Sequence, residues 1–146
     1  MFLNILVAYD GSPSARAALE HAFDLARAQN AKLTVLTVKP SVTSWIALSG
    51  ASSDRMRSEL ESWAEQRTRE ARAAAPDDVI VHTLVREGQP GPEIVKELDG
   101  GPYDLVVLGS RGHGRLESEV LGSVNAYVHF HSKVAMLSID EVASVR

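Results

Sequence analysis

A short apolar run followed at once by a glycine-rich stretch constrains this chain more than any other feature. Residues 105–108 (Leu-Val-Val-Leu) have the composition of a strand that is buried on both faces. Residues 109–122 carry four glycines, two arginines and a histidine, and Ser123 follows as a predicted helix N-cap. A strand, a glycine-rich loop and a helix start form an arrangement that binds phosphate, because backbone N–H groups and the helix dipole favour an anion there.

The same alternation of strand and helix continues along the chain. Apolar runs predict strands at residues 2–8, 32–38, 79–86, 104–108 and 134–139. Helical patterns occupy residues 13–30, 54–75, 93–98 and 123–131, with Ser12 as N-cap and Pro13 at the first helical position. We therefore expect one α/β domain over residues 1–146, with an open parallel sheet, helices on both faces and a short tail at 140–146.

Two features follow predicted strands and are expected at the same edge of the sheet. The turn Asp10-Gly-Ser-Pro follows the first strand, and Gly109 follows the fourth. Ligands of such sheets bind beyond the carboxyl ends of the strands, where the strand order reverses. The loop at residues 41–53 is long enough for a binding role, and the alternative is that its apolar residues fold back on the core.

Composition excludes several classes of function. The net charge of −4 argues against broad binding to nucleic acid or to an anionic membrane surface. The absence of cysteine excludes disulfides and thiol nucleophiles, and is compatible with a cytoplasmic location. No apolar run approaches the roughly 20 residues that a membrane span needs. Residues 2–8 are too short, and lack the basic flank, for a signal peptide.

The spacing of the glycines excludes the two commonest phosphate motifs. There is no Gly-x4-Gly-Lys-Ser/Thr pattern, and the turn after the first strand is not Gly-x-Gly-x-x-Gly. The chain instead carries Gly109-x2-Gly112-x9-Gly122-Ser123. In this motif it resembles the universal stress protein family, whose nucleotide-binding members carry Gly-x2-Gly-x9-Gly-Ser/Thr after the fourth strand. Further matches are residues 7–12 (Val-Ala-Tyr-Asp-Gly-Ser), 85–90 and 121–124.

The resemblance has implications for fold, ligand and assembly. It implies the strand order 3-2-1-4-5 and a homodimer that forms through the last strand. It implies binding of ATP, or of AMP or cAMP as in some members, with Mg²⁺ accompanying ATP. Lys133 stands where the family usually has proline before that last strand.

The resemblance also assigns candidate binding residues. Asp10 matches the acidic residue near the ribose and the bound metal, and Val38 matches the residue beside the adenine. Leu108 and Gly109 match the backbone that flanks the ribose and the α-phosphate. The matched phosphate-binding positions are Gly112, Gly122, Ser123 and Val124.

Three further residues complete the predicted site. Ala8 ends the first strand beside Asp10, and Arg111 offers a positive charge that either neutralises phosphate or is simply solvated. Asn125 stands where many nucleotide-binding members have serine or threonine, and its amide can still donate to phosphate.

The leading hypothesis is a nucleotide-binding regulatory protein whose bound state is read by an unidentified protein partner. One alternative is a slow ATPase or phosphotransferase, for which only Asp10, His113 and Ser123 are available near the phosphates. A family member that acts only by dimerising is disfavoured by the intact glycines. A response-regulator receiver is set aside, because Asp10 has no acidic neighbour and no lysine ends the last strand.

Overall fold

The computed structural model describes residues 1–41, 53–110 and 123–140. These residues form five strands: β1 (Asn4–Ala8), β2 (Lys32–Lys39), β3 (Val81–Glu87), β4 (Leu105–Gly109) and β5 (Ala135–Ile139). They also form the helices α1 (Pro13–Gln29), α3 (Ser53–Ala74), α4 (Pro90–Gly100) and α6 (Ser123–His131).

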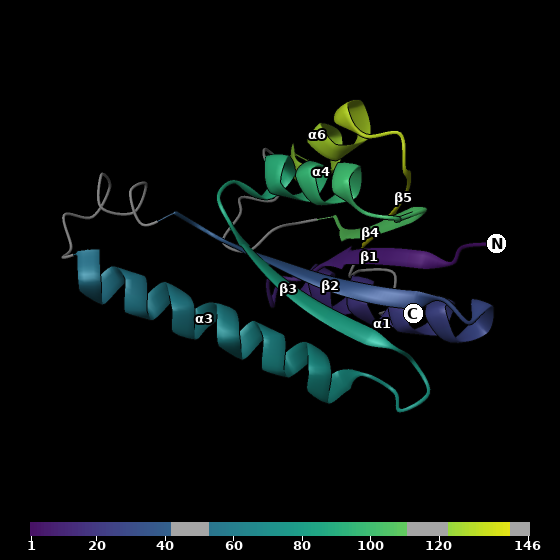
Figure 1. Cartoon of the computed structure of the whole chain (residues 1–146), viewed down its shortest axis with the longest axis horizontal. Helices are drawn as coiled ribbons and strands as arrows, with labels where there is room; N and C mark the ends of the chain where they lie inside the picture. The colour runs from purple at the N-terminus through teal and green to yellow at the C-terminus, as the bar shows by residue number, and fades with distance from the viewer. Residues whose placement is uncertain (42–52, 111–122, 141–146) are drawn as a thin grey trace.

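All five strands are parallel and follow the order β3-β2-β1-β4-β5 (Figure 1). β1 is central: Ile5 lies opposite Leu33 of β2 on one side and Leu105 of β4 on the other. The chain builds the sheet in one direction through β2 and β3, then crosses back to add β4 and β5. The predicted α/β class and strand order are thus confirmed.

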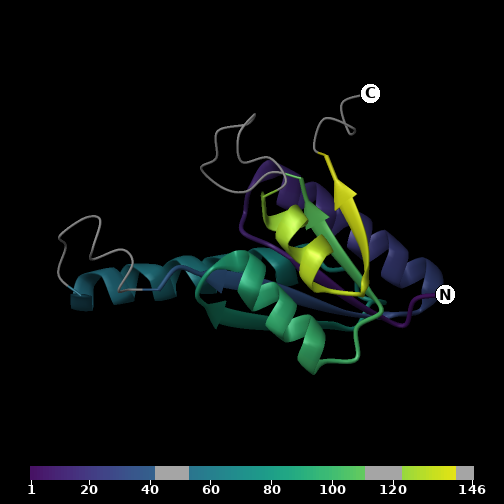
Figure 2. The ribbon, with the colours of Figure 1, turned by 90° about the horizontal axis from the view of Figure 1, so that it is seen from above.

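The sheet separates two apolar layers, which explains why its central strands are apolar without alternation. α1 and α3 cover one face of the sheet, and α4 and α6 cover the other (Figures 1 and 2). Buried side chains alternate between the layers along β1, β2 and β4. On the α1 side lie Ile5, Val7, Leu33, Val35 and Val107. On the α4 side lie Leu6, Leu36, Val106 and Leu108.

The ends of α1 match the sequence prediction. The Ser12 side chain accepts a hydrogen bond from the Ala15 N–H at 3.2 Å, and Pro13 is the first helical residue. Asn30 closes the helix in a left-handed conformation (φ 54°), and its N–H donates to the last turn. This cap fixes where β2 begins.

The helix predicted at residues 93–98 begins earlier than expected. The glycines and prolines of residues 88–92 are typical of a turn, but α4 already begins at Pro90, and the Glu93 N–H donates to Gln89 O at 3.0 Å. Proline fits the first turn because the N–H groups there have no acceptor within the helix. Gly91 is buried against the ring of Tyr127, so α4 and α6 approach closely at this point.

Other differences from the sequence prediction are small. Ser123, predicted as the N-cap, is the first residue of α6. β1 begins two residues later than predicted, and so does β3. The predicted loop at 41–53 and tail at 140–146 fall almost wholly outside the described residues.

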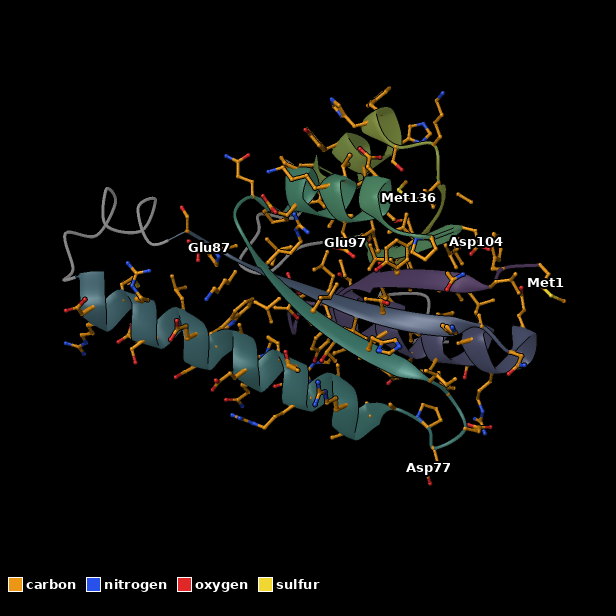
Figure 3. The ribbon with its side chains drawn as sticks, viewed as in Figure 1. Met1, Asp77, Glu87, Glu97, Asp104 and Met136 are labelled. Carbon is orange, nitrogen blue, oxygen red and sulfur yellow. The ribbon has the colours of Figure 1, made fainter. Side chains whose placement is uncertain are left out.

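A charged network ties α4 to the edge strand β3. Arg86 donates to Glu93 Oε1 at 2.9 Å and to Glu97 Oε1 at 3.0 Å, and the Tyr103 hydroxyl donates to Glu97 Oε2 at 2.8 Å (Glu97 is labelled in Figure 3). Both carboxylates are largely shielded from solvent. The hydrogen bond from Arg86 lowers the pKa of Glu93 from its ordinary value of 4.5, although burial opposes this.

We expect the substitution Glu93→Gln to lower the free energy of unfolding by about 1–2 kcal/mol near neutral pH, because it removes a charge-assisted hydrogen bond. The pKa of Glu93 is lower in the folded chain than in the unfolded one. Its stabilisation is therefore fully present above about pH 4.5 and is lost as the pH falls through the folded-state pKa. Urea unfolding at several pH values measures both effects.

The matched control for this prediction is Glu59→Gln. Glu59 pairs with Arg55 on the exposed surface of α3, so we expect a change of no more than about 0.5 kcal/mol. A Glu93→Gln deficit that stays constant on acidification would contradict this account of the network.

Candidate functional site

The candidate site lies where the strand order reverses, at the carboxyl ends of β1 and β4. These strands are neighbours in the sheet, so the ends at Ala8 and Gly109 meet at one edge. Val38 lies near the end of the adjacent strand β2. The structure therefore brings together the predicted residues Ala8, Asp10, Val38, Leu108 and Gly109, as expected for a topological switch point.

Side-chain hydrogen bonds fix the turn after β1. Asp10 Oδ1 accepts the Ser12 N–H at 2.9 Å, which is the local pattern of an Asx turn. Thr37 Oγ1, on the neighbouring strand, donates to the carbonyl of Tyr9 at 3.0 Å. Gly11 has φ +85°, a conformation that side-chain-bearing residues rarely adopt. These contacts place Asp10 in a defined position beside the end of the sheet.

Gly109 lets β4 approach the amino end of α1. A β-carbon at this position would lie 2.6 Å from the Ser14 carbonyl carbon and 2.8 Å from the Ala15 nitrogen. Both atoms belong to backbone, which cannot rotate away as a flexible side chain can. Gly109 thus has a packing role that the sequence motif did not reveal: it joins the exit of β4 to the start of α1.

Ser110 is the residue at this edge that sequence reasoning missed. Its N–H donates to Ile139 O at 2.8 Å, which extends the pairing of β4 with β5. Its Oγ is buried, and no described residue hydrogen-bonds it. Because a buried hydroxyl without a partner is costly, this oxygen calls for a partner from outside the described residues, such as a water molecule or a ligand group. The only signal in the sequence was its place directly after the first glycine of the motif.

The first turn of α6 reaches the same edge of the sheet. Asn125 Nδ2 donates to Ser138 Oγ at 2.6 Å, and Ser138 lies opposite Leu108 in the sheet. Ser123 is exposed, whereas Val124 packs partly against the α4-side core. Arg111, Gly112 and Gly122, the other predicted phosphate-binding residues, lie outside the described part of the chain.

Two arginines reach the turn after β1 from different helices. Arg16 Nε of α1 donates to Gly11 O at 3.1 Å, and the side chain of Arg67 of α3 lies against Gly11. Arg67 is paired with Glu70, which accepts the Tyr9 hydroxyl at 2.7 Å. Burial and the bond to Glu70 raise the pKa of Tyr9 to about 12, so this hydroxyl stays protonated. Burial raises the pKa of Glu70, but its bonds with Tyr9 and Arg67 outweigh that effect and lower it overall.

Within residues 1–41, 53–110 and 123–140, no group of three or more histidine or acidic side chains is placed to hold a metal ion. A Mg²⁺ ion at Asp10 would take its other ligands from water and from nucleotide phosphates, which is the usual pattern for this ion.

Described residues form two surface hollows, and neither is lined by residues from the carboxyl ends of β1 and β4. One, of about 500 Å³, lies between α3 and the ends of β2 and β3, where Lys39, Arg69, Arg72 and Val85 line it. The other, of about 600 Å³, lies at the amino ends of β4 and β5, beside Asp104 and Lys133 (Asp104 is labelled in Figure 3). Neither contains the residues of the glycine motif.

Comparison with known proteins settles the family. A model of the universal stress protein family matches residues 1–139. This chain belongs to the universal stress protein family. The universal stress protein YxiE of Bacillus subtilis is 33% identical over 154 residues, an alignment that covers all of both chains. No helix in the described part of the chain is long and apolar enough to cross a membrane.

Solved structures of similar proteins share the fold. The protein MJ0577 superposes with a TM-score of 0.80 at 24% identity, over 96% of each chain, and this likeness concerns the fold alone. A universal stress protein in complex with cAMP superposes with a TM-score of 0.68 at 25% identity, over 96% of this chain and 98% of that chain. The family resemblance predicted from the glycine spacing is thus confirmed.

We expect Gly109→Ala to lower the free energy of unfolding by about 1–3 kcal/mol, because the new methyl group would push α1 away from β4. Gly100→Ala is the matched control: no atom lies within 4 Å of the corresponding position, so stability should be unchanged or slightly raised. Chemical denaturation of both variants measures the difference. Equal stability of the two variants would show that the contact between Gly109 and α1 is unimportant.

Proposed function

We propose that this universal stress protein binds an adenine nucleotide, ATP in the first instance, across the carboxyl ends of β1 and β4. The observation that carries the proposal is the buried Ser110 Oγ, which has no partner among the described residues and directly follows the glycine packed on α1. A phosphate or ribose oxygen would supply that partner. The relative solved in complex with cAMP supports an adenine nucleotide as the ligand class.

The chemistry of the surrounding residues fits the parts of a nucleotide. Val38 offers an apolar contact for the base at the end of β2. Asp10 is placed to accept from ribose hydroxyls or to hold a Mg²⁺ ion that accompanies the phosphates. The amino end of α6, with Ser123, Val124 and Asn125, offers N–H groups and a favourable dipole to the phosphates. The predicted contacts from Arg111, Gly112 and Gly122 belong to the same proposal.

We propose a binding and regulatory role in place of efficient catalysis. The chain lacks the lysine-bearing phosphate loop of the common nucleotide hydrolases. At most, Asp10 with Mg²⁺ would support slow hydrolysis of ATP. AMP and cAMP are the second candidate ligands, because one universal stress protein of this fold is solved with cAMP and another with AMP.

We expect Ser110→Ala to weaken ATP binding about tenfold to a hundredfold, since it removes a hydrogen bond to a charged ligand. The same substitution should leave the stability of the ligand-free protein unchanged or slightly raised, because it removes an unpaired buried hydroxyl. Isothermal titration with ATP, AMP and cAMP measures the affinities, and urea unfolding measures the stability. Mass spectrometry of nucleotide released from the purified protein identifies the bound species.

Ser58→Ala is the matched control for this experiment. Ser58 is exposed on α3 and lies far along the chain from both strand ends, so affinity and stability should match the wild type. The proposal fails if the wild type binds none of the three nucleotides. It also fails if Ser110→Ala binds ATP as tightly as the wild type does.

We further propose that the protein is a cytoplasmic homodimer joined through β5. Among the described strands, β5 pairs with β4 alone, so one edge of β5 is available for a second copy. A chain without cysteine suits the reducing cytoplasm, where ATP is abundant.

We expect sedimentation equilibrium to give twice the 15.8 kDa mass of one chain at the concentrations used for the nucleotide titrations. The universal stress protein fold leaves β5 at the outer edge of the sheet, and edge strands readily pair with another copy. A mass of one chain at every concentration would rule out the dimer.

A further inference from the structure

A side chain of α3 lies across the turn that carries Asp10. A β-carbon built on Gly11 would lie 2.9 Å from Arg67 Cδ and 3.2 Å from Arg67 Nε. The Arg67 side chain is only 17% exposed, so it is packed onto the turn and does not extend into solvent. Gly11 thus serves two purposes: it allows the positive φ of the turn, and it leaves room for Arg67.

Arg67 is held in this place by its own neighbours. Its guanidinium donates to both oxygens of Glu70, at 3.1 Å and 2.9 Å, in the bidentate geometry that orients an arginine. It also lies over the ring of Trp63, 5.5 Å from the centroid. Trp63, Arg67 and Glu70 follow one another at helical spacing, so they line one stripe of α3.

The same network reaches back to β1. Glu70 accepts the Tyr9 hydroxyl at 2.7 Å, and Tyr9 is buried. Tyr9 immediately precedes Asp10, and Gly11 immediately follows it. Asp10 therefore lies between two residues that α3 contacts, one through Glu70 and the other through Arg67. We call Tyr9, Trp63, Arg67 and Glu70 the Arg67 network.

Packing of α3 onto the sheet does not by itself require this network. The buried residues Leu60, Ala64 and Ala71 already provide the apolar contact of the helix. A partly buried ion pair adds little stability compared with apolar residues of similar size, because both charges lose hydration. The pair instead fixes the orientation of the Arg67 guanidinium, since a bidentate arginine holds a defined orientation. The ion pair therefore holds the Arg67 side chain against the turn beside Asp10.

We propose that Arg67 is a positioning residue for the nucleotide site, which sets the Asp10–Gly11 turn and couples nucleotide binding to α3. This inference rests on the proposed function, because Asp10 is taken to face the nucleotide. A nucleotide that engages Asp10 shifts the turn, the shift displaces Arg67, and the ring of Trp63 senses the change. Conversely, a disturbance of α3 that displaces Arg67 from the turn should change nucleotide affinity.

The experiment uses the full chain with the substitution Trp45→Phe, so that Trp63 is the sole tryptophan, and this chain serves as the wild type in the comparisons that follow. Arg67→Met keeps the aliphatic stem and removes the guanidinium, whereas Arg67→Lys keeps the charge without the bidentate geometry. Arg69→Met, at an exposed position of the same helix, is the control for the change in charge. Glu70→Gln provides a second way to disturb the network if Arg67→Met does not fold.

Three quantities are measured on each variant: the dissociation constant of ATP, the change in Trp63 fluorescence on adding ATP, and the amide NMR signal of Ser12 without ligand. Arg67→Met should weaken ATP binding about five- to thirtyfold, within the range of typical coupling between sites. It should also abolish the fluorescence response and shift the Ser12 signal. Arg67→Lys should fall between Arg67→Met and the wild type, and Arg69→Met should match the wild type.

The outcomes separate this inference from the proposed function. If the wild type binds ATP and Arg67→Met binds it equally, with the same fluorescence response, the positioning role is wrong. Equal losses in Arg67→Met and Arg69→Met would indicate only a general effect of charge, and would also overturn it. If the wild type binds no nucleotide, the proposed function fails. In that case the Ser12 signal still tests the role of Arg67, because an unshifted signal in Arg67→Met would show that Arg67 does not set the turn.

Discussion

The contact between Gly109 and the amino end of α1 is the constraint on which the candidate functional site of this protein depends. It brings the carboxyl end of β4 into close contact with the backbone of Ser14 and Ala15. A β-carbon on residue 109 would not fit in this space. The turn bearing Asp10 and the segment bearing Ser110 consequently lie at one place. The glycine that matches a phosphate motif is therefore first a packing residue, and the proposed ligand site depends on that packing.

Much of the fold could be predicted because its signals are local. Buried parallel strands appear as apolar runs, and Ser12 with Pro13 marks the start of α1. The start of α4 was misplaced because Gly88, Pro90, Gly91 and Pro92 read as a turn, whereas proline and a buried glycine fit the first helical turn when a neighbouring helix packs on them. Tertiary contact with Tyr127 decided that boundary, and no local pattern encodes it.

The candidate site was predictable only in part, for a similar reason. Asp10 and Gly109 follow strands, so their meeting follows from the parallel sheet. Ser110 and Arg67 could not be assigned from spacing. The role of Ser110 depends on the burial of one oxygen atom, and Arg67 meets Gly11 across a long separation in sequence. Asn125 illustrates the opposite case: the family pattern directs attention to its amide, and the structure shows that amide donating to Ser138 of β5.

The most direct test of this account is an amide NMR titration of the full chain with ATP. ATP bound at the carboxyl ends of β1 and β4 should shift the signals of Asp10, Gly109, Ser110 and Val124 together, with saturation at a single dissociation constant. Signals near the amino ends of β4 and β5, such as those of Tyr103, Asp104 and Lys133, should remain unchanged. Shifts confined to these amino ends, or no shifts at all, would contradict a nucleotide site at the carboxyl ends of β1 and β4.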